Sequence, residues 1–174
     1  MRVPATILWL FACLHASGSE MVSVVRFTKA PVPPCRTILV SFEKPDLSIF
    51  RGPVPASVVR DVRDLGAELQ QRMAEALKKA GFEPRTDPAS CSPCDLTIAF
   101  RVTRGEVRLR SIKAPVRIEY YAPAKLSIDF AYSRGASGEL GTLRGKLDSP
   151  GKTELTTMAN EVGAFTAAKI PHKE

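Results

Sequence analysis

The residues best suited to chemistry are the two cysteines of Cys91-Ser92-Pro93-Cys94. A C-x-x-C pair performs thiol–disulfide exchange when its first thiolate is stabilised at the N-terminus of a helix. Here Cys94 leads directly into Asp95-Leu96-Thr97-Ile98, a pattern typical of a strand, so no helix is predicted after the pair. A structural disulfide is therefore favoured, and a thiol-redox or thiol-holding role of Cys91 and Cys94 is the alternative.

Histidine, the usual base at neutral pH, occurs only as His15 and His172, and we expect His172 to lie in a frayed C-terminal tail. A Ser-His or Cys-His pair needs a positioned base, and zinc sites draw on His or on paired Cys sets. The glycine motifs of phosphate loops, nucleophile elbows and dinucleotide-binding turns are missing from the sequence. We therefore predict no catalytic residue, no metal site and no cofactor, and we do not expect an enzyme.

The N-terminus has the layout of a bacterial secretory signal: Arg2, an apolar run over residues 7–12, then small residues up to Gly18. This run is shorter than the ~20 residues of a transmembrane helix. Cleavage after Gly18 would make residues 1–18 a signal peptide. Alternatively, Leu10–Cys13 is a lipobox, residues 1–12 are a lipoprotein signal, and lipidated Cys13 anchors the protein to the outer membrane. Both routes predict a periplasmic protein without a transmembrane span.

Three cysteines remain after either signal: Cys35, Cys91 and Cys94. Export to an oxidising compartment predicts one disulfide that involves Cys94. Cys35 and Cys94 each precede a predicted strand, and they would meet at one sheet edge if those strands are parallel neighbours. The partner of Cys94 is therefore either Cys35 or Cys91.

The hydrophobic pattern predicts one domain over residues 37–174, preceded by a Pro-rich segment, 19–36, that is either a tether or an edge strand. Apolar residues at three- and four-residue steps predict helices over 57–80 and 153–170, with Ser57 as N-cap and Gly81 as the left-handed exit. A short β-branched and apolar run predicts a buried strand at 37–42, and alternation predicts strands at 96–102, 107–110, 126–132 and 140–147, with a turn at Gly105. The expected fold is α+β, a two-layer sandwich in β-α-β-β-β-α order. Two helices would cover one face of a mostly antiparallel sheet of four to five strands.

The positive charge is concentrated in the predicted meander, because residues 101–146 carry ten Lys and Arg against four Asp and Glu. The strand phase places most of these cations on the uncovered face of the sheet, which must be polar in any case. Guanidinium groups on one rigid face are also suited to phosphates and carboxylates. We predict a surface that binds anions, composed of Arg101, Arg108, Arg110, Arg117, Arg144 and Lys146.

Export and the lack of interleaved aromatic residues argue against nucleic acid as the ligand of this surface. Anionic lipid headgroups, lipopolysaccharide phosphates or an acidic envelope protein are the expected partners, bound by a monomer. The loop at 44–56 contains Leu47, Ile49 and Phe50, which either fold back onto the core or form a small docking patch.

Several segments in this order resemble a known family: Thr37–Phe42, a long helix that ends in Ala80-Gly81-Phe82, the alternating stretch 95–100, and a last helix after 126–130. The chain is similar to small cell-envelope lipoproteins. Their fold is shared with the outer-membrane activator of penicillin-binding proteins and with the N-terminal domain of the Tol-system propeller protein. The resemblance covers about residues 37–170 and implies a non-enzymatic adaptor of envelope assembly with no active site. The bulky Phe11 in the lipobox and the extra cysteines depart from that family.

Overall fold

A computed structural model describes residues 20–173 except 92, 114 and 136–137, so both predicted processing sites and Cys13 lie outside the described residues. A single seven-stranded sheet has the order β1-β7-β6-β5-β2-β4, and β3 pairs with β5 beside this path. Its strands are β1 (Val22–Phe27), β2 (Thr37–Phe42), β3 (Phe50–Arg51), β4 (Glu83–Arg85), β5 (Leu96–Lys113), β6 (Arg117–Arg134) and β7 (Gly138–Asp148).

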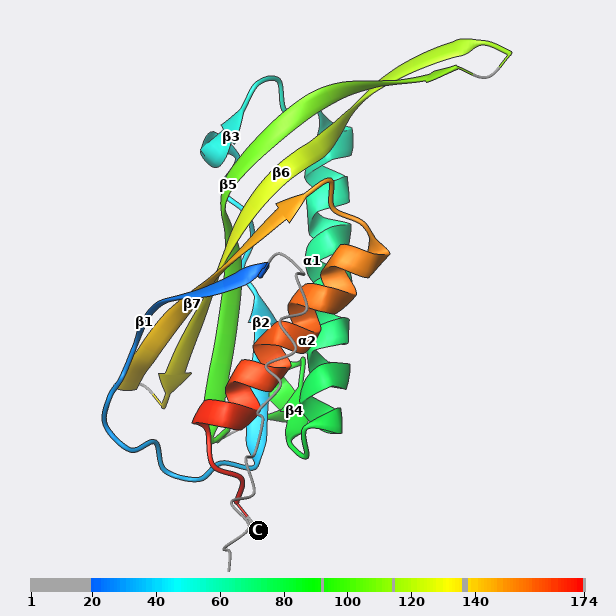
Figure 1. Cartoon of the computed structure of the whole chain (residues 1–174). Coiled ribbons are helices and arrows are strands. Elements are labelled where there is room, and N and C mark those ends of the chain that lie inside the picture. The colour runs from blue at the N-terminus through cyan, green and yellow to red at the C-terminus, as the bar shows by residue number, and fades with distance from the viewer. Residues whose placement is uncertain (1–19, 92, 114, 136–137, 174) are drawn as a thin grey trace, which may run out of the picture.

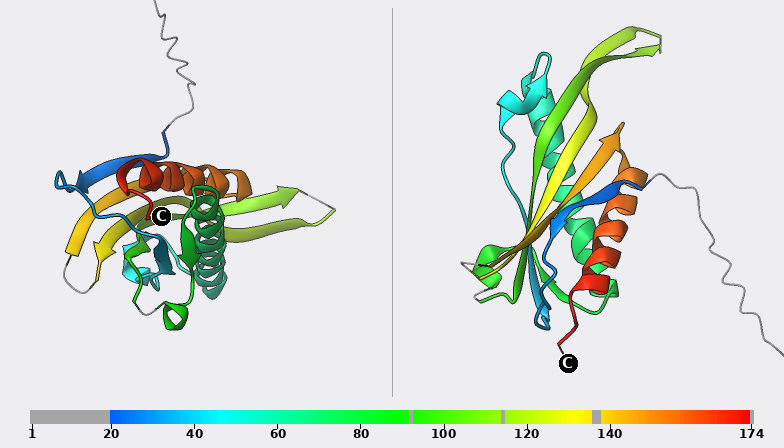
Figure 2. Two further views of the ribbon diagram at one scale, coloured as in Figure 1. Left: turned by 90° about the horizontal axis from the view of Figure 1, so that it is seen from below. Right: turned by 60° about the vertical axis from the view of Figure 1, so that its left-hand side comes forward.

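Two helices, α1 (Ala56–Lys79) and α2 (Lys152–Lys169), pack side by side on the same face of this sheet (Figures 1 and 2). The predicted α+β class is therefore confirmed. The predicted number of strands and their order are wrong, because the chain runs β-β-β-α-β-β-β-β-α. β3 and β4 have only two and three residues and are too short to show alternation, and β1 lies in the segment predicted as a tether or an edge strand.

The core lies between the two layers, where the predicted alternating residues face the predicted helical stripes. From the sheet, Ile98, Phe100 and Phe130 are buried, and α1 and α2 contribute Leu69 and Met158. Tyr132 is also buried completely, and its hydroxyl bonds that of Thr166 on α2 at 2.9 Å. Burial of its phenol raises the pKa of Tyr132.

Both helices start and end within one or two residues of the predicted limits, but the caps differ in part. The N-cap of α1 is Pro55, which has no side-chain acceptor, so the prediction of Ser57 as N-cap is wrong. The prediction that Gly81 follows the first helix in a left-handed backbone conformation is confirmed, because Gly81 has φ +94°. Glycine takes this backbone conformation without the steric cost that a Cβ adds.

The predicted turn at Gly105 does not exist, because β5 continues through this residue. The ring of Phe50 on β3 lies over Gly105 so closely that a Cβ at this position would be 2.2 Å from it. Gly105 therefore accommodates a core aromatic residue rather than a chain reversal. β5 and β6 consequently form one long hairpin, whose far end projects beyond the two layers (Figure 1).

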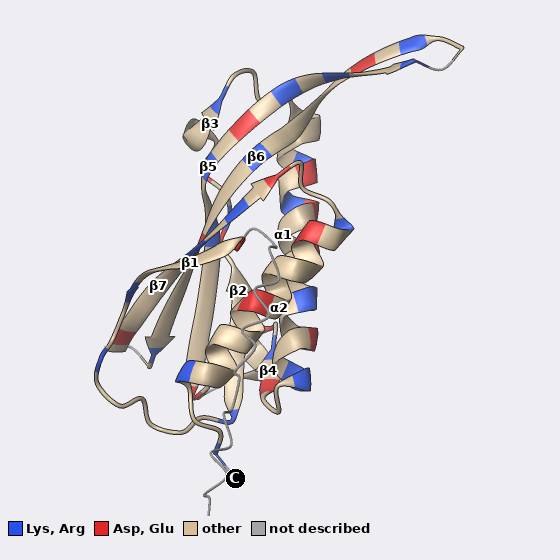
Figure 3. Ribbon diagram, viewed as in Figure 1, with Lys and Arg blue, Asp and Glu red and all other residues tan. Residues whose placement is uncertain are grey.

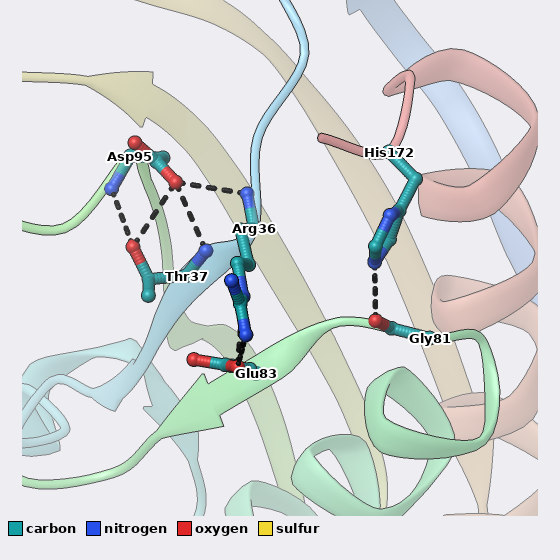
Figure 4. A network of polar contacts seen from close by, with 6 residues as sticks. All are labelled: Arg36, Thr37, Gly81, Glu83, Asp95 and His172. Atoms are coloured by element: carbon teal, nitrogen blue, oxygen red, sulfur yellow. Dashed lines mark hydrogen bonds and ion pairs between the residues drawn. The ribbon is translucent and has the colours of Figure 1, made fainter. Parts of the chain in front are cut away.

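A polar network ties the start of β2 to the start of β5 (Figure 4). Backbone N–H groups of Arg36 and Thr37 donate to one oxygen of Asp95 at 2.8 and 3.0 Å, and the backbone N–H of Asp95 donates to the Thr37 hydroxyl at 3.1 Å. Next to it, Arg36 pairs with Glu83. The hydrogen bonds from Thr37 and Arg36 lower the pKa of Asp95.

The C-terminal tail is part of this region. His172 bonds the carbonyl of Gly81, and its backbone forms a bridge with Cys35 (Figure 4). The expectation that His172 lies in a frayed tail is therefore wrong. Its ring also lies 5.5 Å from that of Phe82, so the tail closes one end of the core.

Replacing Asp95 with alanine is expected to lower the free energy of unfolding at pH 7 by about 2 kcal/mol, because two backbone donors lose a charged acceptor. The lowered folded-state pKa means that this contribution is present above the unfolded value of about 4. It is lost as the pH falls through the folded value. Urea unfolding of Asp95→Ala and of the unsubstituted protein from pH 7 to pH 3 measures the difference in their free energies of unfolding. A difference that does not shrink in acid would contradict the prediction. Asp95→Asn, which keeps one acceptor oxygen, is the matched control.

Candidate anion-binding surface

The face of the sheet opposite the helices, here called the outer face, is organised in rows of side chains across β5, β6 and β7. Residues paired across neighbouring strands point to the same side of a sheet. The strand registers thus define three consecutive rows: Arg101–Asp129–Arg144, Arg104–Ser127–Lys146 and Glu106–Lys125–Asp148. Figure 3 shows basic and acidic residues along these strands.

The two arginines of the first row already face carboxylates of the protein itself. Arg144 donates from Nε and Nη2 to the two carboxylate oxygens of Asp129 at 2.7 and 2.8 Å, a bidentate pair that raises the pKa of Arg144. Arg101 in the same row lies 3.9 Å from the carboxylate of Glu43. Arg144 therefore lies on the face where it was predicted, but its guanidinium is already occupied.

The middle row differs, because Arg104 and Lys146 are exposed and make no ion pair within the described part of the chain. Ser127 lies between them on β6. Lys125 of the third row is likewise exposed and lies diagonally across from both cations. This cluster of Arg104, Ser127, Lys146 and Lys125 is called the cationic cluster below.

The cationic cluster lines a shallow hollow of about 260 Å³. Glu106 and Asp148 lie at its border in the third row, so cations outnumber carboxylates by three to two. Two positive side chains flanking a hydroxyl can offer several donors to one tetrahedral anion, and Arg presents its donors as a planar fork. This geometry is suited to a phosphate group.

The remaining residues predicted for this surface, Arg108, Arg110 and Arg117, do not all lie on the same face of the hairpin. Arg108 and Arg110 lie on the outer face, beyond the cationic cluster on the projecting hairpin, and Arg108 lies 3.7 Å from Glu106. The prediction that Arg117 shares their face is wrong. Lys113 lies three residues after Arg110 on β5, so its side chain points to the opposite side of the sheet. Arg117 is the cross-strand partner of Lys113 and therefore points to that opposite side as well.

Arg104 was missed by the sequence analysis because β5 contains an irregularity, whereas Lys125 lies directly before the predicted strand 126–132 and continues its alternation. The register of β5 shifts between Val102 and Arg104, and again between Glu106 and Val107, opposite Ala124 on β6. A bulge adds one residue and moves the following side chains to the other face. The local signal was the polar run from Thr103 to Glu106, which breaks the alternation around the expected turn.

The apolar residues of the loop before α1 mostly fold back. Phe50 is buried in the core and Ile49 packs against it, whereas Leu47 remains exposed. The docking patch proposed for these three residues thus retains a single apolar side chain.

The cysteines are arranged as one of the two predicted pairings. Cys91 and Cys94 form a disulfide with a Cα–Cα distance of 5.2 Å, in the turn between the 3-10 helix Pro88–Ser90 and β5. Among the described residues around this turn, no α-helix begins that could lower the pKa of a catalytic thiol through its N-terminus. Cys35 is free and buried, and burial raises the pKa of its thiol to about 11.

We expect unreduced protein to react with a thiol reagent at Cys35 only after denaturation, with any free Cys13 counted separately. In the native state the buried, protonated thiol should react slowly. Thiol counting with and without denaturant measures this, and the Cys35→Ser variant identifies the reactive group. Two further reactive thiols in unreduced denatured protein would contradict the disulfide.

Among the described residues, no helix is long and apolar enough to cross a membrane, and no three His, Cys, Asp or Glu side chains are grouped as a metal site requires. These findings cover the described residues alone.

Neither protein-family models nor curated proteins match this sequence. Among solved structures, a PelC dodecamer from Paraburkholderia phytofirmans is similar, with 15% identity and TM-score 0.46 over 88% of this chain and 100% of that one. A minor lipoprotein from Acinetobacter baumannii shares 10% identity, with TM-score 0.35 over 82% and 98% of the two chains. At these values no family is assigned, and the resemblance to envelope lipoproteins remains a prediction.

Proposed function

We propose that this chain is an exported, non-enzymatic binding protein of the bacterial envelope that attaches to an anionic membrane surface through the outer face of its sheet. The observation that supports this most directly is the cationic cluster, in which Arg104, Lys125 and Lys146 are exposed without ion-pair partners in the described residues. The secretory layout of residues 2–18 supports a location in the periplasm.

The arrangement of charge favours lipid phosphates over a carboxylate-rich protein. The free cations extend from the cationic cluster to Arg110 on the hairpin, as an extended surface rather than a closed pocket. An array of headgroup phosphates can contact all of these cations at once, and each cation near such a surface contributes about 1 kcal/mol. Solubility alone does not require this concentration, because dispersed charges serve equally well.

The full chain should bind vesicles of equimolar phosphatidylglycerol and phosphatidylcholine at low salt, and should not bind vesicles of phosphatidylcholine alone. Because exposed charges are screened over a Debye length of about 10 Å at 0.1 M salt, binding should weaken steeply with added salt. Vesicle flotation measures both effects. Failure to bind anionic vesicles even at low salt would contradict the proposed function, and so would equal binding to both compositions.

A further inference from the structure

The projecting end of the β5–β6 hairpin is a two-stranded ribbon with both edges open. β2 pairs with β5 only as far as Phe100, β3 pairs with it at Gly105 and Glu106, and β7 pairs with β6 from Lys125 onward. Within the described residues, the backbones of 107–113 and 117–123 are therefore paired only with each other. An isolated two-stranded ribbon is marginally stable in water, so a ribbon of this length suggests that something contacts it.

This ribbon displays apolar side chains that the core does not use. Six of the nine large hydrophobic residues that are exposed in the described chain lie on it: Leu109, Ile112, Val116, Ile118, Tyr120 and Tyr121. Val116 at the tip is 71% exposed, and Ile112 and Ile118 stand directly opposite each other just behind it. Such a cluster at the end of a projection marks an interaction site rather than scattered surface residues.

Cations accompany these apolar residues. Arg108, Arg110, Lys113 and Arg117 lie within residues 107–121, which contain a single carboxylate, Glu119. Lys113 and Arg117 are direct cross-strand partners, and Arg117 is paired with Glu119 at 2.7 Å, so Lys113 is the cation at this end of the ribbon that has no ion pair among the described residues. The same charges would repel the hairpin of a second copy. The occupant should therefore be both apolar and anionic, which describes an anionic lipid bilayer.

We infer that the tip of this hairpin inserts into the interfacial region of an anionic bilayer, an inference that rests on the proposed function. Ile112, Val116 and Ile118 would enter among the upper acyl chains, while Lys113 extends back to the phosphates and Arg117 keeps its ion pair with Glu119. Tyr120 lies four residues from Val116, about 13 Å along the strand, at the level of the headgroups, where Tyr is favoured. The open strand edges limit insertion to this shallow depth, because unpaired backbone groups are not tolerated in the hydrocarbon core.

The test uses tryptophan as a reporter of depth. Trp9 is the only tryptophan of the sequence, so Trp9→Phe in the full chain gives a background for Val116→Trp and for a control, Val24→Trp, on exposed β1. With anionic vesicles, Val116→Trp should shift its emission to the blue and should be quenched by phosphatidylcholine brominated near the top of its acyl chains. Val24→Trp should show neither change.

A second arm measures affinity. The triple variant Ile112→Ser, Val116→Ser, Ile118→Ser should bind anionic vesicles roughly 100-fold more weakly than the unsubstituted chain, because three apolar contacts with the bilayer are lost. As a control, the double variant Val24→Ser, Leu47→Ser removes exposed apolar side chains outside the ribbon and should bind normally. Urea unfolding of both variants verifies that they are folded, since exposed positions carry little stability.

The outcomes separate the two proposals. If the unsubstituted chain does not bind anionic vesicles, the proposed function fails. If it binds, but Val116→Trp is not quenched or the tip triple binds normally, the insertion is wrong while surface attachment stands. An emission shift of Val116→Trp that depends on protein concentration without vesicles would also overturn the insertion, because the tip would then contact a second copy.

Discussion

Replacing Arg104, Lys125 and Lys146 together with serine is expected to weaken binding to anionic vesicles by roughly 150-fold. Each cation near an anionic surface contributes about 1 kcal/mol, so the three together contribute about 3 kcal/mol, and every 1.4 kcal/mol is tenfold in affinity. The slope of affinity against salt should also become shallower, because fewer charges are screened. Vesicle flotation across a salt series measures both quantities.

The matched control removes the same charge from the other side of the molecule. Arg60, Arg63 and Lys78 are exposed on α1 and make no ion pair within the described residues. Their replacement with serine changes the net charge equally but leaves the outer face intact. If both triple variants lose affinity to the same extent, binding follows net charge, and the cationic cluster is not the contact surface.

The largest loss of stability from a single substitution is expected for Tyr132→Ala, about 4 kcal/mol. Tyr132 is fully buried, and its ring meets those of Phe27 on β1 at 5.6 Å and Phe165 on α2 at 6.0 Å. Removing it leaves a cavity where the edge strand, the sheet and α2 meet, and large-to-small core substitutions of this kind cost about 3–5 kcal/mol.

Tyr132→Phe separates packing from hydrogen bonding in the same site. It keeps the ring and removes only the hydroxyl that bonds Thr166, whose own hydroxyl still donates to the carbonyl of Val162 at 2.7 Å. The expected cost is therefore only about 1 kcal/mol. Urea unfolding measures both variants. Comparable losses in Tyr132→Phe and Tyr132→Ala would show that the hydrogen bond, not the ring, dominates this contact.

The sequence alone predicted the α+β class, the two long helices and the buried faces of the central strands. These features follow from local periodicity: Leu96, Ile98 and Phe100 alternate, and Val62, Leu69 and Met73 recur at helical steps, so the buried residues are apparent without knowledge of their partners. The sequence also showed that the positive charge is concentrated in residues 101–146. Its interpretation as an anion-binding surface remains a proposal.

What the sequence could not show depends on pairing between distant strands. The bulge next to Val102 moves Arg104 onto the outer face, and the register of the hairpin sets Arg117 against Lys113 on the other face. The ring of Phe50 makes Gly105 part of a strand rather than a turn. Likewise, the choice of Asp129 as the partner of Arg144 requires β6 and β7 to be in register.

Period-two alternation reports the face of a residue only until the first bulge, because one extra residue inverts every side chain after it. Tertiary structure therefore decided which cations are free, which are paired, and that a ribbon of apolar and basic residues projects from the sandwich.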